Sequence, residues 1–365
     1  MEVKFKDLLF IYEKQISCNV KNKKKLLNFE RNKFQNLINI YYDIKNNNYS
    51  VEHYNVFLIR EPKKRIVMSL NIHDKIINHY VTTFILIPKL EKYLDHRNIA
   101  TRKNKGSDYG IKLVKKYLEL LKKYNQIYVL KLDISKYFYN IDHEVLKHMI
   151  KDELNIDEYK IVCSIIDSTN EYYVHNTILK YQKKDTNIPN YEFGKGLPIG
   201  NLTSQFLSIF YLNRLDHYIV HDLHLKYYVR YMDDFLIFHY DKHYLEKCLI
   251  KIKHQLNNIY HLKVNENKTK IMNIKEGFVF LGYCFKIKNN KTIIKLRSKT
   301  FYKVKKRIKE VNYLYKENKI NFPKYFSSIN NYRFTFKYAN NYKILNYSEF
   351  SVKMLQKLCI NFQRK

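Results

Sequence analysis

The 365-residue chain contains no tryptophan and only 7 glycines and 5 prolines. The scarcity of glycine and proline argues against low-complexity linkers. A chain of this length and composition favours globular domains with a sizeable core. No apolar run approaches the roughly 20 residues that a membrane-spanning helix requires, so we expect no membrane association. The N-terminal stretch contains acidic residues and no small-residue cleavage site, which is unlike a secretory signal. We therefore expect a cytoplasmic protein.

Cysteine is also sparse and follows no metal-binding pattern. The five cysteines stand far apart in the sequence: Cys18, Cys163, Cys248, Cys284 and Cys359. Without a CxxC pair or a Cys/His cluster, the chain is not expected to hold structural zinc. An odd number of scattered cysteines also favours a reducing compartment.

Acidic residues are few. Asp and Glu total 34 against 67 Lys and Arg, which gives a formal net charge of +33. Such an excess repels itself in a compact fold, and a polyanion such as nucleic acid would offset it. A lysine-rich surface from an AT-rich genome is an alternative that explains the abundant lysine but not the scarce acids. The 35 tyrosines and 22 phenylalanines suit both a core and base stacking.

The spacing of apolar residues predicts helices interrupted by short strands. Helices are expected at residues 1–50, 71–94, 143–175 and 242–259, in the second half of 96–124, after the Gly/Pro loop of 194–220, and through most of the last 70 residues. Strands are expected as a pair at 54–70 around a basic turn, at the start of 126–141, as a hairpin at 227–238 and as a pair at 278–296.

Two adjacent carboxylates lie in the middle of the predicted hairpin YYVRYMDDFLIF. They are Asp233 and Asp234, and a third acid, Asp133, ends the apolar strand IYVLKL. The pair alone is more often an ordinary polar turn. If the strands are neighbours in one sheet, however, three carboxylates meet at one edge and repel unless a cation neutralises them. Oxygen ligands suit Mg²⁺, and two such ions can clamp a phosphoryl displacement, so the cluster on a basic chain favours nucleotidyl transfer.

These segments resemble the ordered motifs of reverse transcriptases. YMDD between apolar strands resembles motif C, LDISKYFYNID resembles motif A, and GKGLPIGNLTSQF between them resembles motif B. Upstream, REPKKRIVMS and RNIATRKNKGSDYGI resemble the finger motifs. Downstream, NENKTKI and FLGY resemble motif D and the primer grip. The order agrees from about residue 56 to residue 285, and the chain is identified as a member of that family on this basis.

The resemblance implies an α+β right-hand polymerase fold with an antiparallel palm sheet backed by helices. The fingers are expected at residues 1–125, the palm at 126–290 with a finger-side insertion near 150–193, and the thumb at 291–365. The same resemblance implies a bacterial or phage-encoded protein.

The resemblance also assigns roles to individual residues. Asp133, Asp233 and Asp234 match the catalytic and metal-binding acids, with the backbone carbonyl of Ile134 as a further ligand. The implied cofactor is a pair of Mg²⁺ ions, with Mn²⁺ as an alternative. The residues matched to binding of the incoming nucleotide are Arg65 with Arg60 or Lys64, Phe138 as the steric gate that favours dNTPs, Gly200, Gln205, and Lys268 or Lys270 from motif D. The primer grip matches Leu281, Gly282 and Tyr283.

Motif B suggests which kind of reverse transcriptase this is. Group II intron and retron-type enzymes usually carry Pro-Gln-Gly there, whereas this chain has Pro198-Ile199-Gly200. GLPIGNLTSQ resembles the enzymes of diversity-generating retroelements, as do ATRKNKGSDYGI and the block at residues 327–345. In that family, copying of a template repeat is error-prone at adenines. An aliphatic Ile199 cannot hydrogen-bond to the nascent pair as glutamine can, so we expect weaker discrimination.

The partners implied by this resemblance are an RNA template, a DNA or cDNA primer, dNTPs and a small basic pentameric accessory protein. Alternatives remain open. A defence-associated (antiphage) or retron-type bacterial enzyme would use its own non-coding RNA. An RNA-dependent RNA polymerase disagrees with Phe138, and a non-catalytic RNA-binding protein disagrees with the three intact aspartates.

Overall fold

The computed structural model describes residues 3–61 and 63–339. The predicted thumb therefore lies only in part within the described residues. Cys359 and the part of the 327–345 block beyond residue 339 lie outside them. The chain divides into two compact units, of which the first comprises Met1–Gly106, Lys131–Ile237 and His243–Lys270. The second comprises Ser107–Leu130, Phe238–Lys242 and Ile271–Lys365.

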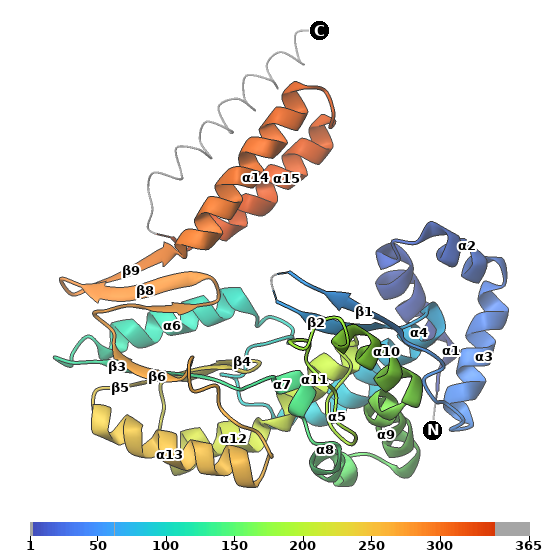
Figure 1. Ribbon diagram of the computed structural model, residues 1–365, viewed down its shortest axis with the longest axis horizontal. Helices are drawn as coiled ribbons and strands as arrows, with labels where there is room; N and C mark the ends of the chain where they lie inside the picture. Colours follow the sequence, from blue (N-terminus) through green and yellow to red (C-terminus); the bar gives the residue numbers. More distant parts are fainter. Residues whose placement is uncertain (1–2, 62, 340–365) are drawn as a thin grey trace. The chain divides into compact units, whose positions relative to one another are not determined.

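The first unit is mostly helical (Figure 1). Its helices are α1 (Phe5–Ile11), α2 (Lys23–Arg31), α3 (Lys33–Lys45), α4 (Ile72–Tyr80), α5 (Ile87–Leu90), α7 (Tyr137–Asn140), α8 (His143–Ile150), α9 (Ile156–Asp167), α10 (Tyr172–Gln182), α11 (Leu202–Tyr211), α12 (Asn213–His217) and α13 (Lys242–Asn258, whose first residue belongs to the second unit). A π-helical turn at Val81–Leu86 continues α4 into α5. The helices predicted from apolar spacing are thus confirmed within the described residues.

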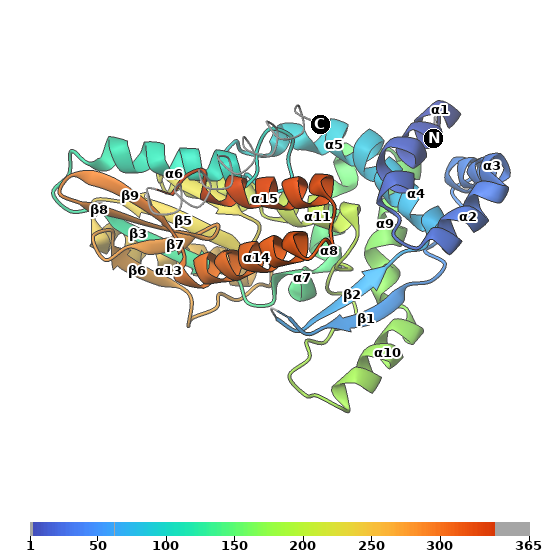
Figure 2. The same cartoon turned by 90° about the horizontal axis from the view of Figure 1, so that it is seen from above.

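The described part of the second unit contains one long helix and, further along the chain, a helical pair. These are α6 (Ser107–Leu121), α14 (Ser298–Lys316) and α15 (Phe322–Phe336). Figure 2 shows α14 and α15 lying side by side, and the two helices pack against each other. A stack of Tyr315 on Tyr325, with ring centroids 4.4 Å apart, helps to hold this pair together.

Nine strands form three sheets within the described residues. The strands are β1 (Asn55–Ile59), β2 (Arg65–Ser69), β3 (Tyr128–Asp133), β4 (Tyr228–Tyr231), β5 (Asp234–His239), β6 (Lys270–Asn273), β7 (Phe278–Phe280), β8 (Tyr283–Lys288) and β9 (Lys291–Leu296). The sheet orders are β1-β2, β4-β5-β3-β6 and β7-β8-β9. The pairs β1–β2, β4–β5, β7–β8 and β8–β9 are antiparallel, so the predicted α+β class is confirmed.

The segment 278–296 differs from the predicted strand pair because it forms three strands. Leu281 and Gly282 adopt left-handed backbone conformations, with φ of +47° and +85°. Two successive left-handed residues reverse the chain in a tight hairpin turn. This turn divides the long apolar run into β7 and β8, which pair antiparallel.

The hairpin β4–β5 lies in the core of the first unit. Tyr228 and Val229 on β4 and Phe235, Leu236 and Ile237 on β5 are fully buried. Helix α11 is also buried nearly all round, from Thr203 to Tyr211. A strand buried on both faces reads as a continuous apolar run rather than an alternation, which is the pattern seen in this part of the sequence.

A buried ion pair crosses this core. Arg230 on β4 and Asp216 on α12 are both fully buried. The pair is bidentate, with Nε to Oδ1 at 2.7 Å and Nη2 to Oδ2 at 2.6 Å. The guanidinium also donates to the carbonyl oxygens of Ile209, at 2.9 Å, and Met232, at 3.0 Å. Arg230 thereby ties helix α11, helix α12 and the tip of the β4–β5 hairpin to one another.

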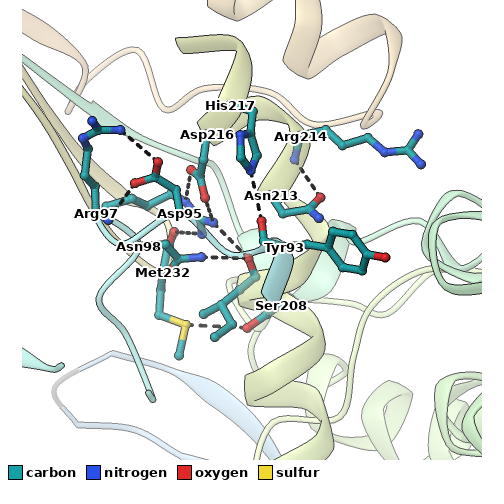
Figure 3. A network of polar contacts seen from close by, with 12 residues as sticks. Tyr93, Asp95, Arg97, Asn98, Ser208, Asn213, Arg214, Asp216, His217 and Met232 are labelled. Carbon is teal, nitrogen blue, oxygen red and sulfur yellow. Dashed lines mark hydrogen bonds and ion pairs between the residues drawn. The ribbon is translucent and has the colours of Figure 1, made fainter. Parts of the chain in front are cut away.

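The segment just before α6 adds to the edge of β4. Asn98 forms a parallel bridge with Arg230, in which the Arg230 N–H donates to Arg97 and the Ile99 N–H donates to Arg230. The buried Asn98 amide donates to the carbonyl of Ile209 at 3.1 Å. Figure 3 shows these contacts around Asn98, Asp216 and Met232, so one network of polar groups joins three separate stretches of chain.

No helix among residues 3–61 and 63–339 is long and apolar enough to cross a membrane.

The buried ion pair predicts a large loss of stability on truncation. Arg230→Met would leave the Asp216 carboxylate buried and unpaired, at a cost of about 3–5 kcal/mol in the free energy of unfolding. Arg230→Met combined with Asp216→Asn should recover part of that loss, because no buried charge remains and the amide can still accept from Tyr228. Urea denaturation measures the free energy of unfolding of the single and the double variant. Arg214→Met, on the exposed face of α12, is the control and should change stability little. Equal losses in the single and double variants would contradict the account.

Candidate active site

Strands β3 and β5 are neighbours in the four-stranded sheet and bring the three predicted acids together. Strand β3 ends at Asp133, and β5 begins at Asp234. The N–H of Ile134 donates to the carbonyl oxygen of Asp233 at 3.3 Å, which places the two strand ends side by side. Asp233 and Asp234 therefore stand at the tip of the hairpin, next to the end of β3.

A second contact fixes the backbone around Asp133. The Asn265 N–H donates to the Asp133 carbonyl at 2.7 Å, and the Ser135 N–H donates to the Lys263 carbonyl at 2.8 Å. These bonds form an antiparallel bridge around Ile134. The segment that follows α13 thus lies directly beside the acids.

The hairpin tip is held in an unusual conformation. Met232 has φ of +56°, in the left-handed region that residues other than glycine rarely adopt. The Arg230 guanidinium donates to its carbonyl oxygen at 3.0 Å, and its sulfur accepts from the Ser208 hydroxyl at 3.5 Å (Figure 3). Contacts on both its backbone and side chain therefore stabilise Met232, and with it the direction in which Asp233 leaves the turn.

Burial and mutual repulsion make the carboxylates reluctant to ionise. Burial raises the pKa of Asp233, and the charge of Asp133 raises it further. Burial also raises the pKa of Asp234 to about 6, although Lys131 opposes the shift. The Oδ1 atom of Asp234 is buried and has no hydrogen-bond partner. Each of these effects would be relieved by a cation at this position.

Two lysines partly compensate the acids. Lys268 contacts Asp133 with Nζ to Oδ2 at 2.6 Å, and Lys131 contacts Asp234 with Nζ to Oδ2 at 3.3 Å. Burial would lower the pKa of Lys268, but the hydrogen bond and charge of Asp133 outweigh it and raise the pKa. Of the two motif D candidates, Lys268 is the one that reaches an acid. Lys270 is exposed on β6.

Sequence reasoning missed two of the cations near the acids. Lys131 points from β3 to Asp234, and the charge of Lys63 lowers the pKa of Asp233. Lys131 is two residues before Asp133, so the alternation of side chains along a strand puts both on the same face. That spacing could have predicted the contact. The basic turn at Lys63 lies 170 residues before Asp233, and nothing local in the sequence predicts their approach.

The acids offer oxygen ligands of the kind that a divalent cation takes. Within the part of the chain that the structure describes, no three His, Cys, Asp or Glu side chains are placed to hold a metal ion. In this arrangement Asp133 is paired with Lys268 and Asp234 with Lys131. The donor set still fits Mg²⁺, because it consists of carboxylate oxygens, one of which is buried and unpartnered. A shift of the two lysines would free oxygens on both acids.

Phe138 lies five residues after Asp133, on the short helix α7. Its neighbours Tyr137 and Tyr139 are buried, whereas Phe138 is only half-buried. Lys136, with φ of +46°, turns the chain before α7. The Leu197 N–H donates to the Phe138 carbonyl at 2.8 Å, which holds the backbone of Phe138 next to the start of the motif B loop. Phe138 is therefore not an ordinary core residue.

The motif B loop is fastened to strand β2. The Met68 N–H donates to the Ile199 carbonyl at 2.9 Å. Gly200 has φ of +129°, and a Cβ atom there would lie 2.9 Å from the Met68 carbonyl oxygen, so no larger residue fits without a shift. The side chains of Ile199 and Gln205 are both half-buried.

The predicted triphosphate cations lie at the β1–β2 turn. Arg60 and Arg65 are exposed, and Lys64 forms an ion pair with Asp185. This pairing binds Lys64 to the loop that follows α10. Of the three cations predicted to bind the triphosphate, Arg60 and Arg65 are therefore the two with exposed side chains.

The predicted primer-grip residues belong to the second unit. Leu281 and Gly282 form the β7–β8 turn, and the Arg297 N–H donates to the Gly282 carbonyl at 3.0 Å. Tyr283 is buried on β8, and burial raises the pKa of its hydroxyl to about 12.

The raised pKa of Asp234 predicts a pH-dependent stability in the absence of metal. Its value of about 6 lies above the roughly 4 of an unfolded aspartate, so the native state binds this proton more tightly. The resulting stability is present below about pH 4 and is lost as the pH rises through about 6. Melting temperatures in EDTA should fall less steeply over this pH range for Asp234→Asn than for the wild type, because the raised pKa of Asp233 contributes to the fall in both.

Asp222→Asn, which changes the same charge at an exposed position, is the control and should behave as the wild type. Parallel profiles for the wild type and Asp234→Asn would show that burial of this carboxylate is not costly.

The chain matches a protein-family model described as reverse transcriptase (RNA-dependent DNA polymerase) over residues 46–285. No curated protein matched the chain in a search of sequences. Among solved structures, telomerase from Candida albicans in complex with a TWJ fragment of telomeric RNA is 16% identical, with a TM-score of 0.47, and covers 70% of this chain and 46% of that one. Apo telomerase from Candida tropicalis, truncated from its C-terminal domain, is 14% identical, with a TM-score of 0.48 and coverages of 73% and 60%.

At these identities and TM-scores, the likeness to the telomerases says nothing about activity. The chain also spans only 46% and 60% of the two telomerase chains. The match to the family model is stronger evidence than these structural similarities, because it covers more than half of the chain. The matched residues include every predicted motif from the β1–β2 turn to β8. The chain therefore belongs to the reverse transcriptase family.

Proposed function

We propose that the protein is an RNA-directed DNA polymerase whose active site is formed by Asp133, Asp233 and Asp234. The observation that carries the proposal is the juxtaposition of these acids at the ends of β3 and β5, in a site where burial and repulsion raise the pKa values of Asp233 and Asp234. Ionisable groups with strongly perturbed pKa values are concentrated at functional sites. Membership of the reverse transcriptase family supports the same assignment.

The acids would hold two divalent cations, Mg²⁺ or Mn²⁺, with the backbone carbonyl of Ile134 as a further ligand. Bound there, the cations supply charge stabilisation for the attacking and leaving oxygens of an in-line displacement. Lys268, which contacts Asp133 at 2.6 Å, would exchange this carboxylate partner for the phosphates of a nucleotide. Its raised pKa keeps it protonated, as a proton donor to a leaving group must be.

The remaining predicted residues would select and hold substrates. Phe138 would stand under the sugar of the incoming dNTP and clash with a 2′-hydroxyl. Gly200 and Gln205 would pack against the nascent pair, and the exposed arginines Arg60 and Arg65 would bind the triphosphate.

The right-hand domains would follow the predicted boundaries: fingers at 1–125, palm at 126–290 with an insertion near 150–193, and thumb at 291–365. Leu281, Gly282 and Tyr283 would contact the primer as its grip. The substrates would be an RNA template, a DNA or cDNA primer and dNTPs.

The direct test is extension of a DNA primer annealed to an RNA template with dNTPs and Mg²⁺. Asp233→Asn should reduce the extension rate on the order of 10³-fold, equivalent to about 4 kcal/mol of transition-state stabilisation. Asp222→Asn, with the same change of charge on an exposed surface, should extend as the wild type does. Undiminished extension by Asp233→Asn would refute the active-site assignment. Extension with rNTPs at equal efficiency would refute the assignment as a DNA polymerase.

We further propose that the enzyme copies a template repeat with low fidelity, as in a diversity-generating retroelement. Two observations support it: motif B carries Ile199 where an amide is usual, and the backbone of Ile199 is fastened to β2 at 2.9 Å. A fixed backbone with an aliphatic side chain leaves the nascent pair without a hydrogen-bonding partner at this position. The proposal includes a structured template RNA and a small basic pentameric accessory protein as partners.

Ile199→Gln should lower misincorporation opposite template adenines several-fold, while errors at the other bases change little. Sequencing of primer-extension products measures this, and Ile199→Leu, which keeps the aliphatic character, is the matched control. An error spectrum that is the same for Ile199→Gln as for the wild type would exclude this role for Ile199.

A further inference from the structure

A basic groove lies in the second unit, and none of the three aspartates lines it. It has a volume of about 700 Å³ and is formed by the end of α6, the residues leading into β3, the segment between β6 and β7, and the β8–β9 hairpin. A volume of this order is typical of sites that accommodate a nucleotide-sized ligand.

The lining of the groove carries only positive charge. Four lysines contribute to it, namely Lys122, Lys275, Lys286 and Lys288, and no Asp or Glu lines it. Lys122 is paired with Glu119 at 2.6 Å. The other three make no ion pair with any residue that the structure describes. Three uncompensated cations around one concave surface attract a polyanion more strongly than the same cations on a flat, solvated surface.

The floor of the groove is apolar, and an aromatic stack leads into it. Ile127 and Ile274 are 5% and 2% exposed. Tyr124 lines the groove and stacks on Tyr240 with ring centroids 4.4 Å apart. Tyr240 is 49% exposed and also stacks on His239, with ring centroids 4.3 Å apart, so the stack continues to the surface through His239. The Lys123 ammonium lies over the Tyr124 ring, 5.1 Å from its centroid. Proteins bind single-stranded nucleic acid with cationic grooves that carry aromatic side chains, on which the bases stack.

The rim of the groove adds side-chain amides on a tight turn. Asn289 and Asn290 have φ of +48° and +57° and join Lys288 to Lys291, which are paired across the hairpin. Two left-handed residues in a two-residue loop form a type I′ turn, for which asparagine is favoured. Both amides border the groove together with Asn125, and amides can donate to and accept from base edges.

We propose that this groove binds a single-stranded nucleic-acid segment, with its phosphates on the lysines and a base against the tyrosine stack. The lysines alone would suit any polyanion, but the apolar floor and the aromatic stack favour exposed bases over a duplex, whose bases are already stacked. The inference rests on the proposed function only in requiring a protein that works on nucleic acid, and it adds a contact separate from the acid site.

The test combines Lys286→Glu with Lys288→Glu and measures affinity for fluorescent U12 RNA and dT12 DNA across a range of salt concentrations. Loss of two phosphate contacts should reduce the slope of log Kd against log salt concentration by about 1.4. The affinity for the oligonucleotide should then be about 25-fold weaker at 0.1 M salt. The matched control is Lys247→Glu with Lys251→Glu on α13, two exposed lysines with the same total change of charge. The RNA and DNA arms identify which strand the groove takes.

A second measurement locates the contact directly. U12 carrying 4-thiouridine should photo-cross-link to the peptide that contains Tyr124, and the Lys286→Glu/Lys288→Glu variant should lose this cross-link while the control retains it. Equal affinity of both variants for U12 and dT12, or equal weakening for a 12-base-pair duplex, would overturn the proposal.

Extension of a short preannealed primer–template by the Lys286→Glu/Lys288→Glu variant should remain within about twofold of the wild type. Loss of that activity would place the lysines in the polymerase site and also overturn the proposal. Failure of the proposed function is distinguishable, because Asp233→Asn would then extend normally while binding to the groove persists.

Discussion

The ion pair between Arg230 and Asp216 is the contact on which the local arrangement of the first unit depends. One guanidinium binds a carboxylate on α12, a carbonyl at the end of α11 and the carbonyl of Met232 at the hairpin tip. A pair this deeply buried contributes little net stability over apolar residues of the same size, because both charges lose their hydration. The pair instead specifies the position of β4, since only one placement of β4 against α11 and α12 satisfies every N–H donor of the Arg230 guanidinium. The left-handed turn that carries Asp233 follows from that placement.

In the acid site, unlike in the Arg230–Asp216 pair, the negative charges are only partly compensated by positive ones. Asp233 and Asp234 are held by the fold in positions where they repel Asp133 and lose hydration, and Lys131 and Lys268 relieve this only in part. An ordinary turn would place two such acids in water. The same arrangement is useful in nucleotidyl transfer, since a site that is short of positive charge favours cations and the phosphates they bring. The excess of basic residues elsewhere on the chain agrees with a polyanionic substrate.

Much of this arrangement follows from local sequence. The apolar runs on either side of Asp233–Asp234 and before Asp133 predicted β4, β5 and β3, and the structure confirms them, because short runs rich in β-branched and aromatic residues favour buried strands. Other features depend on residues far apart in the chain. The partnership of Arg230 with Asp216 and the approach of Lys63 to Asp233 are set by tertiary packing, so no periodicity predicts them. The division of 278–296 into three strands was missed because a left-handed Leu281 is rare.

The central claim is that Asp133, Asp233 and Asp234 bind divalent metal at one place. Fe²⁺ can replace Mg²⁺ and, with ascorbate and peroxide, generates hydroxyl radicals that cut the nearby backbone. Mapping of the fragments should show cuts close to residues 133 and 233, which excess Mg²⁺ suppresses and Asp233→Asn abolishes. Cuts at other positions only, or cuts that persist undiminished in Asp233→Asn, would contradict the account.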